Sequence, residues 1–112
     1  MMSDGRVPNL NEVLQTAQKM QQQLKRVQDE LAGKIIEGSA GGGMVVAKVN
    51  GRSQLVSIAL DREVVDPNDI DMLQDLVVAA VNQALGKASE LAQQELSQVA
   101  GGLPFKLPDG LF

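Results

Sequence analysis

A heptad pattern near the start of the chain constrains the fold more than any other feature. Its apolar positions are spaced alternately by three and four residues: Leu10, Val13, Ala17, Met20, Leu24, Val27 and Leu31. This spacing predicts one helix from Asn9 to Ala32, with a seam on which another helix packs. Such a helix is about 36 Å long. A globule of 112 residues cannot cover that length, so part of the helix should project or pack on a second chain.

After Gly33 the period changes to the alternation typical of strands. Three strands are predicted, at Lys34–Gly38, Met44–Val49 and Arg52–Leu60. A flexible turn, Ser39–Gly43, joins the first two. Between the last two strands lies Asn50-Gly51, which favours a two-residue type I′ turn because both residues must reach positive φ. The order of elements therefore predicts an antiparallel meander after the first helix.

The two-residue turn fixes which residues share a face of the hairpin. It would pair Val49 with Arg52, Ala47 with Gln54 and Val45 with Val56. One face would then form the core: Val45, Ala47, Val49, Val56, Ile58 and Leu60. The other face is only half polar, and three apolar residues near its middle predict contact with a second subunit: Met44, Val46 and Leu55. The helical seam adds Met20, Leu24 and Val27 to this predicted dimer interface.

A second long helix follows the strands. Asp66 is expected to cap it, with Pro67 in the first turn. Apolar residues then keep a period near 3.6 up to Val99, and the helix should end near Gly101. Small residues occupy its middle and predict a close approach by the sheet or another helix: Ala79, Ala80, Ala84 and Gly86. The acidic residues at its start fit capping better than calcium binding, since they miss the EF-hand spacing.

The composition excludes most catalytic chemistry. The chain has no His and no Cys, so Ser-His, Cys-His and His–metal arrangements are impossible. Two Phe and no Tyr or Trp leave little to line a small-molecule pocket. The sequence therefore predicts a protein that is not an enzyme, takes no metal, cofactor or small-molecule substrate, and binds other macromolecules. The lack of Cys suits a cytoplasmic location, and no apolar run is long enough to span a membrane.

The predicted polar face of the first helix is the candidate binding site. Six residues at heptad positions b, c and f form it: Gln15, Gln18, Lys19, Gln22, Lys25 and Arg26. A stripe of cations and amides suits a phosphate backbone, although a merely solvated face gives the same pattern. The net charge of −4 argues in the other direction, because phosphate binding depends mainly on Lys and Arg.

Taken together, the helix, three strands, helix and Pro-containing tail resemble the YbaB/EbfC family of bacterial nucleoid-associated proteins. The resemblance runs from about Leu10 to the C-terminus. Its motifs are Gln18–Gln21, Gly41–Val45, Val49–Gly51, Val56–Asp61, Asp71–Ala84, Leu103-Pro104 and Leu107–Gly110.

The resemblance implies an α+β homodimer in which the sheets form the centre and the helices project like the arms of tweezers. It also implies DNA binding in the nucleoid, with effects on DNA compaction or gene expression. We carry this role to the stripe on the first helix, and also to Lys87 on the second. Two alternatives stay open: an acidic homodimeric protein-interaction module, and an accessory subunit that does not touch DNA.

The two ends of the chain fall outside the periodic elements. The domain is expected to cover residues 9–100, with a flexible segment over 1–8 and a tail containing Pro and Gly over 101–112. The tail is also rich in apolar residues, so it could instead be an arm that docks on another surface.

Overall fold

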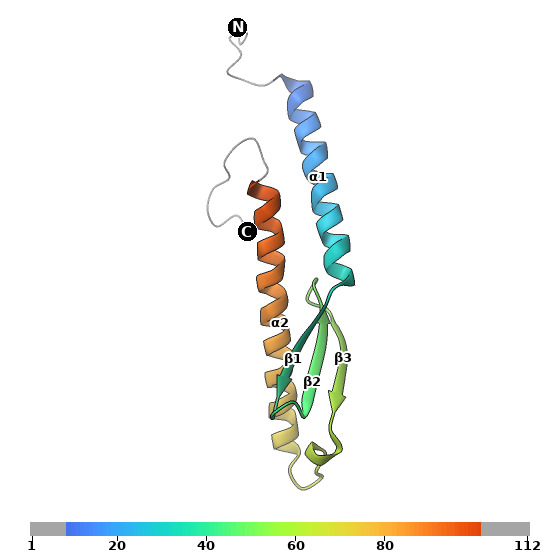
Figure 1. The fold of residues 1–112 in the computed structure, drawn as a ribbon, viewed down its shortest axis with the longest axis vertical. Coiled ribbons are helices and arrows are strands. Elements are labelled where there is room, and N and C mark those ends of the chain that lie inside the picture. Colours follow the sequence, from blue (N-terminus) through green and yellow to red (C-terminus); the bar gives the residue numbers. More distant parts are fainter. Residues whose placement is uncertain (1–8, 102–112) are drawn as a thin grey trace.

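The computed structural model describes residues 9–101, which fold as helix, three-stranded sheet and helix (Figure 1). The elements in chain order are α1 (Leu10–Gly33), β1 (Ile35–Ala40), β2 (Val45–Asn50), β3 (Leu55–Leu60), the short 3₁₀ helix η1 (Arg62–Val64) and α2 (Ile70–Gly101). The predicted α+β order is confirmed. The expected end segments, 1–8 and most of 101–112, lie outside the described residues.

The heptad pattern forms α1 as predicted. The Asn9 side chain accepts a hydrogen bond from the backbone N–H of Glu12 at 2.8 Å, which caps the first turn. Only the last part of the seam is buried in this chain: Val27 and Leu31 pack against Val99 of α2, with Leu24, Leu91 and Ala92 around them. The seam therefore finds its helical partner partly within the same chain.

The three strands form an antiparallel sheet in the order β1-β2-β3. The turn between β1 and β2 is the predicted glycine turn, and Gly41, Gly42 and Gly43 all have positive φ. Glycine adopts this conformation without steric cost.

The sequence-based prediction of the turn between β2 and β3 is wrong. It is longer than two residues, because the Asn50 carboxamide oxygen accepts from the N–H groups of Arg52 (2.9 Å) and Gln54 (3.1 Å). Ser53 has a φ of 63°. The strands therefore pair Val49 with Leu55, Ala47 with Ile58 and Val45 with Leu60. The register shift between Lys48 and Val49 leaves Val56 as an extra residue, a β-bulge.

The start of α2 also differs from the prediction. The helix begins at Ile70, and Asp69 caps it by accepting from the N–H of Met72 at 3.2 Å. Asp66 instead accepts from the N–H of Asn68 in the preceding turn. Both aspartates have the chemistry of a cap, and the second one starts the helix.

The middle of α2 packs closely on the sheet, as its small residues predict. Ala80, Ala84 and Ala88 are fully buried against Val45, Ala47 and Val49 of β2. Gly38 of β1 lies directly against the α2 backbone at Ala80 and Ala84. The side-chain amide of Gln83 adds a hydrogen bond from the N–H of Ser39, at 2.8 Å.

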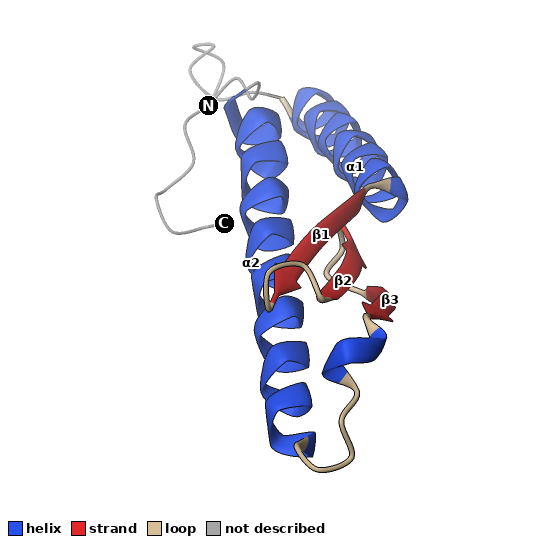
Figure 2. Ribbon diagram, turned by 60° about the horizontal axis from the view of Figure 1, so that its bottom comes forward, coloured by secondary structure: helices blue, strands red, loops and turns tan. Residues whose placement is uncertain are grey.

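The third strand lies outside this core. α2 packs mainly on β1 and β2 (Figure 2), and every residue of β3 is exposed. Ile58 and Leu60 were expected in the core, but their exposed fractions are 38% and 43%, and that of Val56 is 55%. One helix covers only two neighbouring strands, so the apolar inner face continues uncovered onto β3.

Candidate functional site

The predicted stripe lies on the exposed surface of α1. All six of its residues are exposed in the structure: Gln15, Gln18, Lys19, Gln22, Lys25 and Arg26. We call them the α1 stripe. The apolar seam turns the other way, so the helix places these polar side chains in solvent as the heptad pattern indicates.

Two cations of the α1 stripe have acidic partners that the sequence interpretation missed. Lys25 Nζ lies 3.3 Å from an Asp29 carboxylate oxygen, and Arg26 Nη1 lies 3.0 Å from Glu30 Oε1. Each pair joins residues four positions apart on one helix. That spacing was visible in the sequence, since such residues are neighbours on a helix surface. Within residues 9–101, Lys19 has no ion pair.

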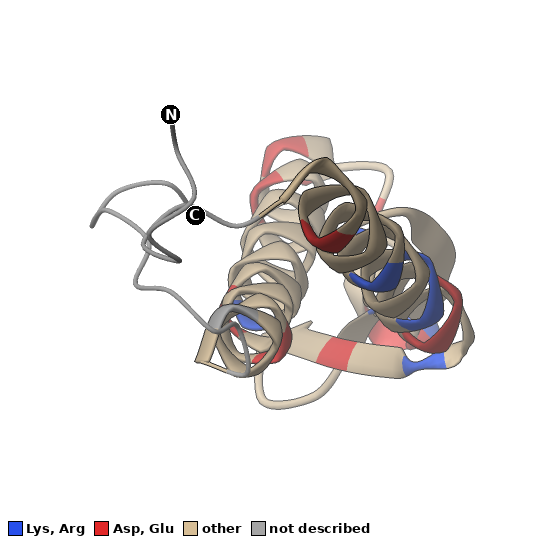
Figure 3. Cartoon of the chain, turned by 90° about the horizontal axis from the view of Figure 1, so that it is seen from above, with Lys and Arg blue, Asp and Glu red and all other residues tan. Residues whose placement is uncertain are grey.

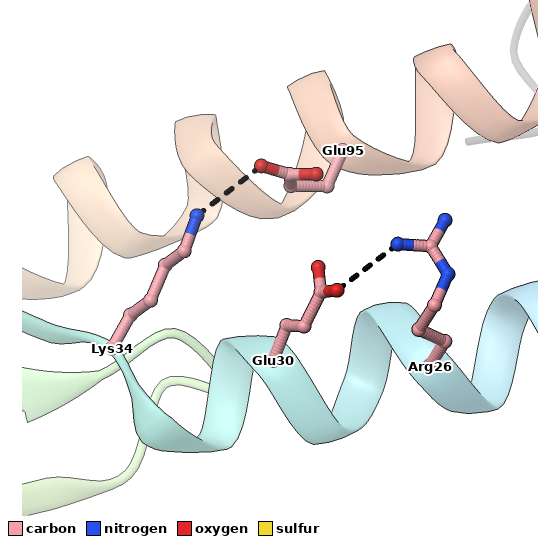
Figure 4. A network of polar contacts seen from close by, with 4 residues as sticks. All are labelled: Arg26, Glu30, Lys34 and Glu95. Carbon is pink, nitrogen blue, oxygen red and sulfur yellow. Dashed lines mark hydrogen bonds and ion pairs between the residues drawn. The ribbon is translucent and has the colours of Figure 1, made fainter.

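Arg26 also lies beside the second helix. It lines a shallow crevice between α1 and α2 together with Gln23, Glu95 and Gln98. Figure 4 shows its ion pair with Glu30 next to a second pair, in which Lys34 reaches across to Glu95 at 3.3 Å. The Lys34–Glu95 pair ties the end of α1 to α2. The Lys25 side chain is 79% exposed and that of Arg26 62%, so Lys25 faces solvent more fully.

Lys87 is not grouped with the α1 stripe. Its ammonium donates a hydrogen bond to the backbone carbonyl of Glu37 in β1, at 3.0 Å. It therefore links α2 to the edge of the sheet.

The negative charge of the chain is concentrated away from the α1 stripe. Residues 61–75 carry six carboxylates and one Arg, a net charge of −5. Because the whole chain carries −4, the other residues together carry +1. The acidic segment includes η1 and the start of α2, at the end of the molecule opposite the start of α1 (Figure 1). Viewed down the long axis, both cationic and acidic residues lie along α1 itself (Figure 3).

The predicted dimer residues divide into two groups. Val27 is buried and Leu24 half-buried in the cluster between α1 and α2, and Met44 packs against the core under α2. These contacts lie within one chain. Met20 and Val46 are half-buried, and Leu55 is 50% exposed. Leu55 lies opposite Val49, on the core side of the sheet rather than on the opposite face where the predicted register put it.

Neither a metal centre nor a membrane span is found in the described part of the chain. Residues 9–101 hold no group of three or more acidic side chains arranged to bind a metal ion. None of their helices is long and apolar enough to cross a membrane.

Comparison with known proteins identifies the family. Residues 5–103 match the YbaB/EbfC DNA-binding family. The chain belongs to this family. Curated relatives are similar to this chain over most of its sequence. A protein of Chloroflexus aggregans named nucleoid-associated protein is 50% identical over 95 residues, which is 85% of this chain and 95% of that one. One of the same name from Syntrophobacter fumaroxidans is 53% identical over 102 residues, or 88% of this chain and 92% of that one.

A solved structure has the same fold. The crystal structure of an uncharacterized protein from Helicobacter pylori superposes with a TM-score of 0.76, over 82% of this chain and 97% of that chain. Its sequence identity is 18%, so this similarity concerns the fold alone.

Proposed function

We propose that this protein binds duplex DNA in the bacterial nucleoid as a homodimer, mainly through phosphate contacts made by the α1 stripe. Membership of a DNA-binding family supports the choice of DNA as partner, as does the name nucleoid-associated protein that its relatives carry. The observation that carries the site is the exposure of all six stripe residues on one projecting helix.

The charge distribution makes this proposal compatible with an acidic chain. Phosphate contact depends on the local electrostatic field rather than on total charge. The carboxylates of residues 61–75 lie at the end of the molecule away from the start of α1, and interactions beyond about 10 Å are largely screened at 0.1 M salt. DNA should therefore approach along α1 and avoid the acidic end.

The contacts of the α1 stripe should depend little on the base sequence of the DNA. The α1 stripe has one Arg, two Lys and three Gln, whereas base readout relies on bidentate side chains inserted into a groove. Such binding would act on nucleoid organisation or gene expression through occupancy of DNA rather than through a defined operator.

A gel-shift series at increasing salt tests this proposal. A dimer presents up to six stripe cations, three from each chain. Log affinity should fall linearly with log salt, with a slope no steeper than about −5, the limit for six contacts. Duplexes of unrelated sequence should bind within roughly tenfold of each other. Absence of binding at low salt, or affinity that does not depend on salt, would contradict the proposal and favour the protein-interaction module.

The dimer is proposed to form through β3. This strand is at the edge of the sheet, and it exposes apolar side chains, among them Leu55, Ile58 and Leu60. An exposed apolar edge strand invites pairing with another chain. A two-fold axis would place the β3 strands of two copies against each other and cover the inner face that α2 leaves open.

Replacing Ile58 with Asp should weaken this dimer, because it places an unpaired charge in the proposed contact. We expect the dimer to dissociate at micromolar concentration in sedimentation velocity, a loss of at least roughly tenfold in association, or about 1.4 kcal/mol. Ser57→Asp is the matched control, since it adds the same charge on the neighbouring residue, opposite Lys48. An Ile58→Asp variant that dimerises as well as the parent would remove β3 as the interface.

A further inference from the structure

The positive and negative charges of α1 cancel within the helix. Between residues 10 and 33 the three cations of the α1 stripe are matched by Glu12, Asp29 and Glu30. Two of these acids lie one turn beyond a cation and contact it, at 3.3 Å for Asp29 and 3.0 Å for Glu30. Only Lys19 is left without an ion pair among the stripe's cations, within residues 9–101.

We infer that Asp29 and Glu30 are internal competitors of the DNA phosphate, and that they limit both the affinity and the salt dependence of the α1 stripe. This inference rests on the proposed DNA-binding function. It adds that two acidic residues, Asp29 and Glu30, would determine the affinity for DNA although neither makes a favourable contact with it.

The competition follows from the chemistry of the paired groups. A carboxylate and a phosphate are both oxygen anions that accept from the same ammonium and guanidinium donors. Lys25 and Arg26 each keep further donors after making one ion pair. A phosphate can therefore reach them in two ways. It can displace the carboxylate, or it can bind beside the carboxylate and experience repulsion from it. Either way the contact is weaker than one to a free cation.

Because the ion pairs are exposed, they weaken phosphate binding to these cations without preventing it. The side chains of Lys25 and Asp29 are 79% and 69% exposed, and those of Arg26 and Glu30 are 62% and 48% exposed. An exposed pair four residues apart on a helix changes an equilibrium by roughly a factor of two. A dimer has two such pairs in each chain, so together they should lower the affinity on the order of tenfold.

The experiment compares two variants with the same change in net charge. The first, Asp29→Asn with Glu30→Gln, removes both partners of the α1 stripe. The control, Asp71→Asn with Asp75→Asn, removes two carboxylates from the first turns of α2, in the acidic segment at the other end of the molecule. Affinity for one fixed duplex is measured at several salt concentrations for the parent and both variants.

The first variant should bind about tenfold more tightly than the parent near 0.1 M salt, and the control should stay within about twofold because its charges are screened. The salt slope should also steepen. Six free cations would approach a slope of about −5, and the parent slope should be shallower because Lys25 and Arg26 are already partly neutralised by their carboxylates.

Folding should not obscure the comparison. Removing acids from the last turns of α1 is favourable with respect to the helix dipole, and far-ultraviolet circular dichroism checks helicity. Asp29→Asn alone provides a second variant, which should tighten binding by about fourfold in a dimer through the two Lys25 side chains it frees.

The outcomes separate the two proposals. If the parent binds DNA but the first variant gains no more than the control, Asp29 and Glu30 do not compete and this inference is overturned while DNA binding stands. If neither the parent nor any variant binds DNA, the proposed function fails, and this inference fails with it.

Discussion

Replacing Gly38 with Ala should destabilise the fold strongly. Gly38 is buried in β1, and a Cβ atom there would meet the carbonyl oxygen of Ala80 and the backbone nitrogen of Ala84. It would also lie 3.0 Å from the Cα atom of Ala84. These are backbone atoms of α2, so no side-chain rotation can relieve the overlap.

The expected loss follows from what would have to move. To admit the methyl group, α2 must lift away from β1, which opens the layer formed by Ala80, Ala84 and Ala88. Overpacking of this kind costs about 1–3 kcal/mol and occasionally more. Because the strained contact is with backbone, we expect about 3 kcal/mol or more. For a domain of this size that lowers the melting temperature by roughly 15 °C, as measured by circular dichroism or calorimetry.

Gly86→Ala is the matched control. Gly86 is exposed on α2, and a Cβ atom there meets nothing within 4 Å. Alanine is a better helix former than glycine by about 0.8–1 kcal/mol, so this variant should melt slightly higher than the parent. Glycine-to-alanine substitution should therefore lower the melting temperature at Gly38 and raise it at Gly86. Similar melting temperatures for both variants would show that α2 does not lie against Gly38 as described.

The fold could be predicted where one local pattern decides it. The three-four spacing that runs to Leu31 has one good solution, a helix with a seam, and α1 is that helix. The alternation of Val45, Ala47 and Val49 puts all three on one face, and all three are fully buried. In both cases the backbone has a fixed period, so the spacing of residues along the sequence determines which face of the helix or strand their side chains occupy.

Prediction failed where a second interaction of similar strength competes. Asn50-Gly51 favours a two-residue turn, but the Asn50 carboxamide can also close a longer loop by accepting two backbone N–H groups, and it does so. Asp66 and Asp69 are both able to cap a helix, and only Asp69 caps α2. Sequence alone does not rank such alternatives, because their free energies differ by about 1 kcal/mol.

The extent of the core could not be predicted either. Alternation identifies the inner face of β3, but it does not say how many strands one helix covers. Ile58 therefore has the pattern of a core residue and remains 38% exposed. The heptad seam has the same ambiguity. Its spacing indicates a helical partner for Val27 without saying whether that partner is α2 of the same chain or a helix of another.

The exposure of the α1 stripe was predicted, but its ion pairs were not. Exposure of Lys19, Lys25 and Arg26 follows from the heptad positions they occupy and is confirmed. Their pairing with acids was not predicted, since the α1 stripe itself ends at Arg26. The carboxylates that neutralise it begin three residues later, at Asp29. A count of charges four residues apart would have found both pairs.

Replacing Lys19 and Arg26 together with Glu should abolish DNA binding. These two residues are seven positions apart, hence two turns, or about 10 Å along one line of α1, and both are exposed. The double variant changes the charge of the α1 stripe from +3 to −1 in each chain, so a dimer repels phosphate along both helices. Affinity should fall by at least roughly a hundredfold near 0.1 M salt, the loss expected when several phosphate contacts are removed.

The control for this variant must carry the same charge change at another place. Arg52 and Arg62 serve this purpose, because they lie in the loop before β3 and in η1, and neither has an ion pair among residues 9–101. Replacing both with Glu should weaken binding only slightly, since they are not on α1. The Lys19 and Arg26 variant should keep its helix stability to within about 1 kcal/mol, the cost of losing the Arg26–Glu30 pair and of placing a second carboxylate one turn from Glu30. If it binds DNA as well as the parent does, the α1 stripe is only a solvated face. A protein-interaction role for the projecting helix would then explain the structure better.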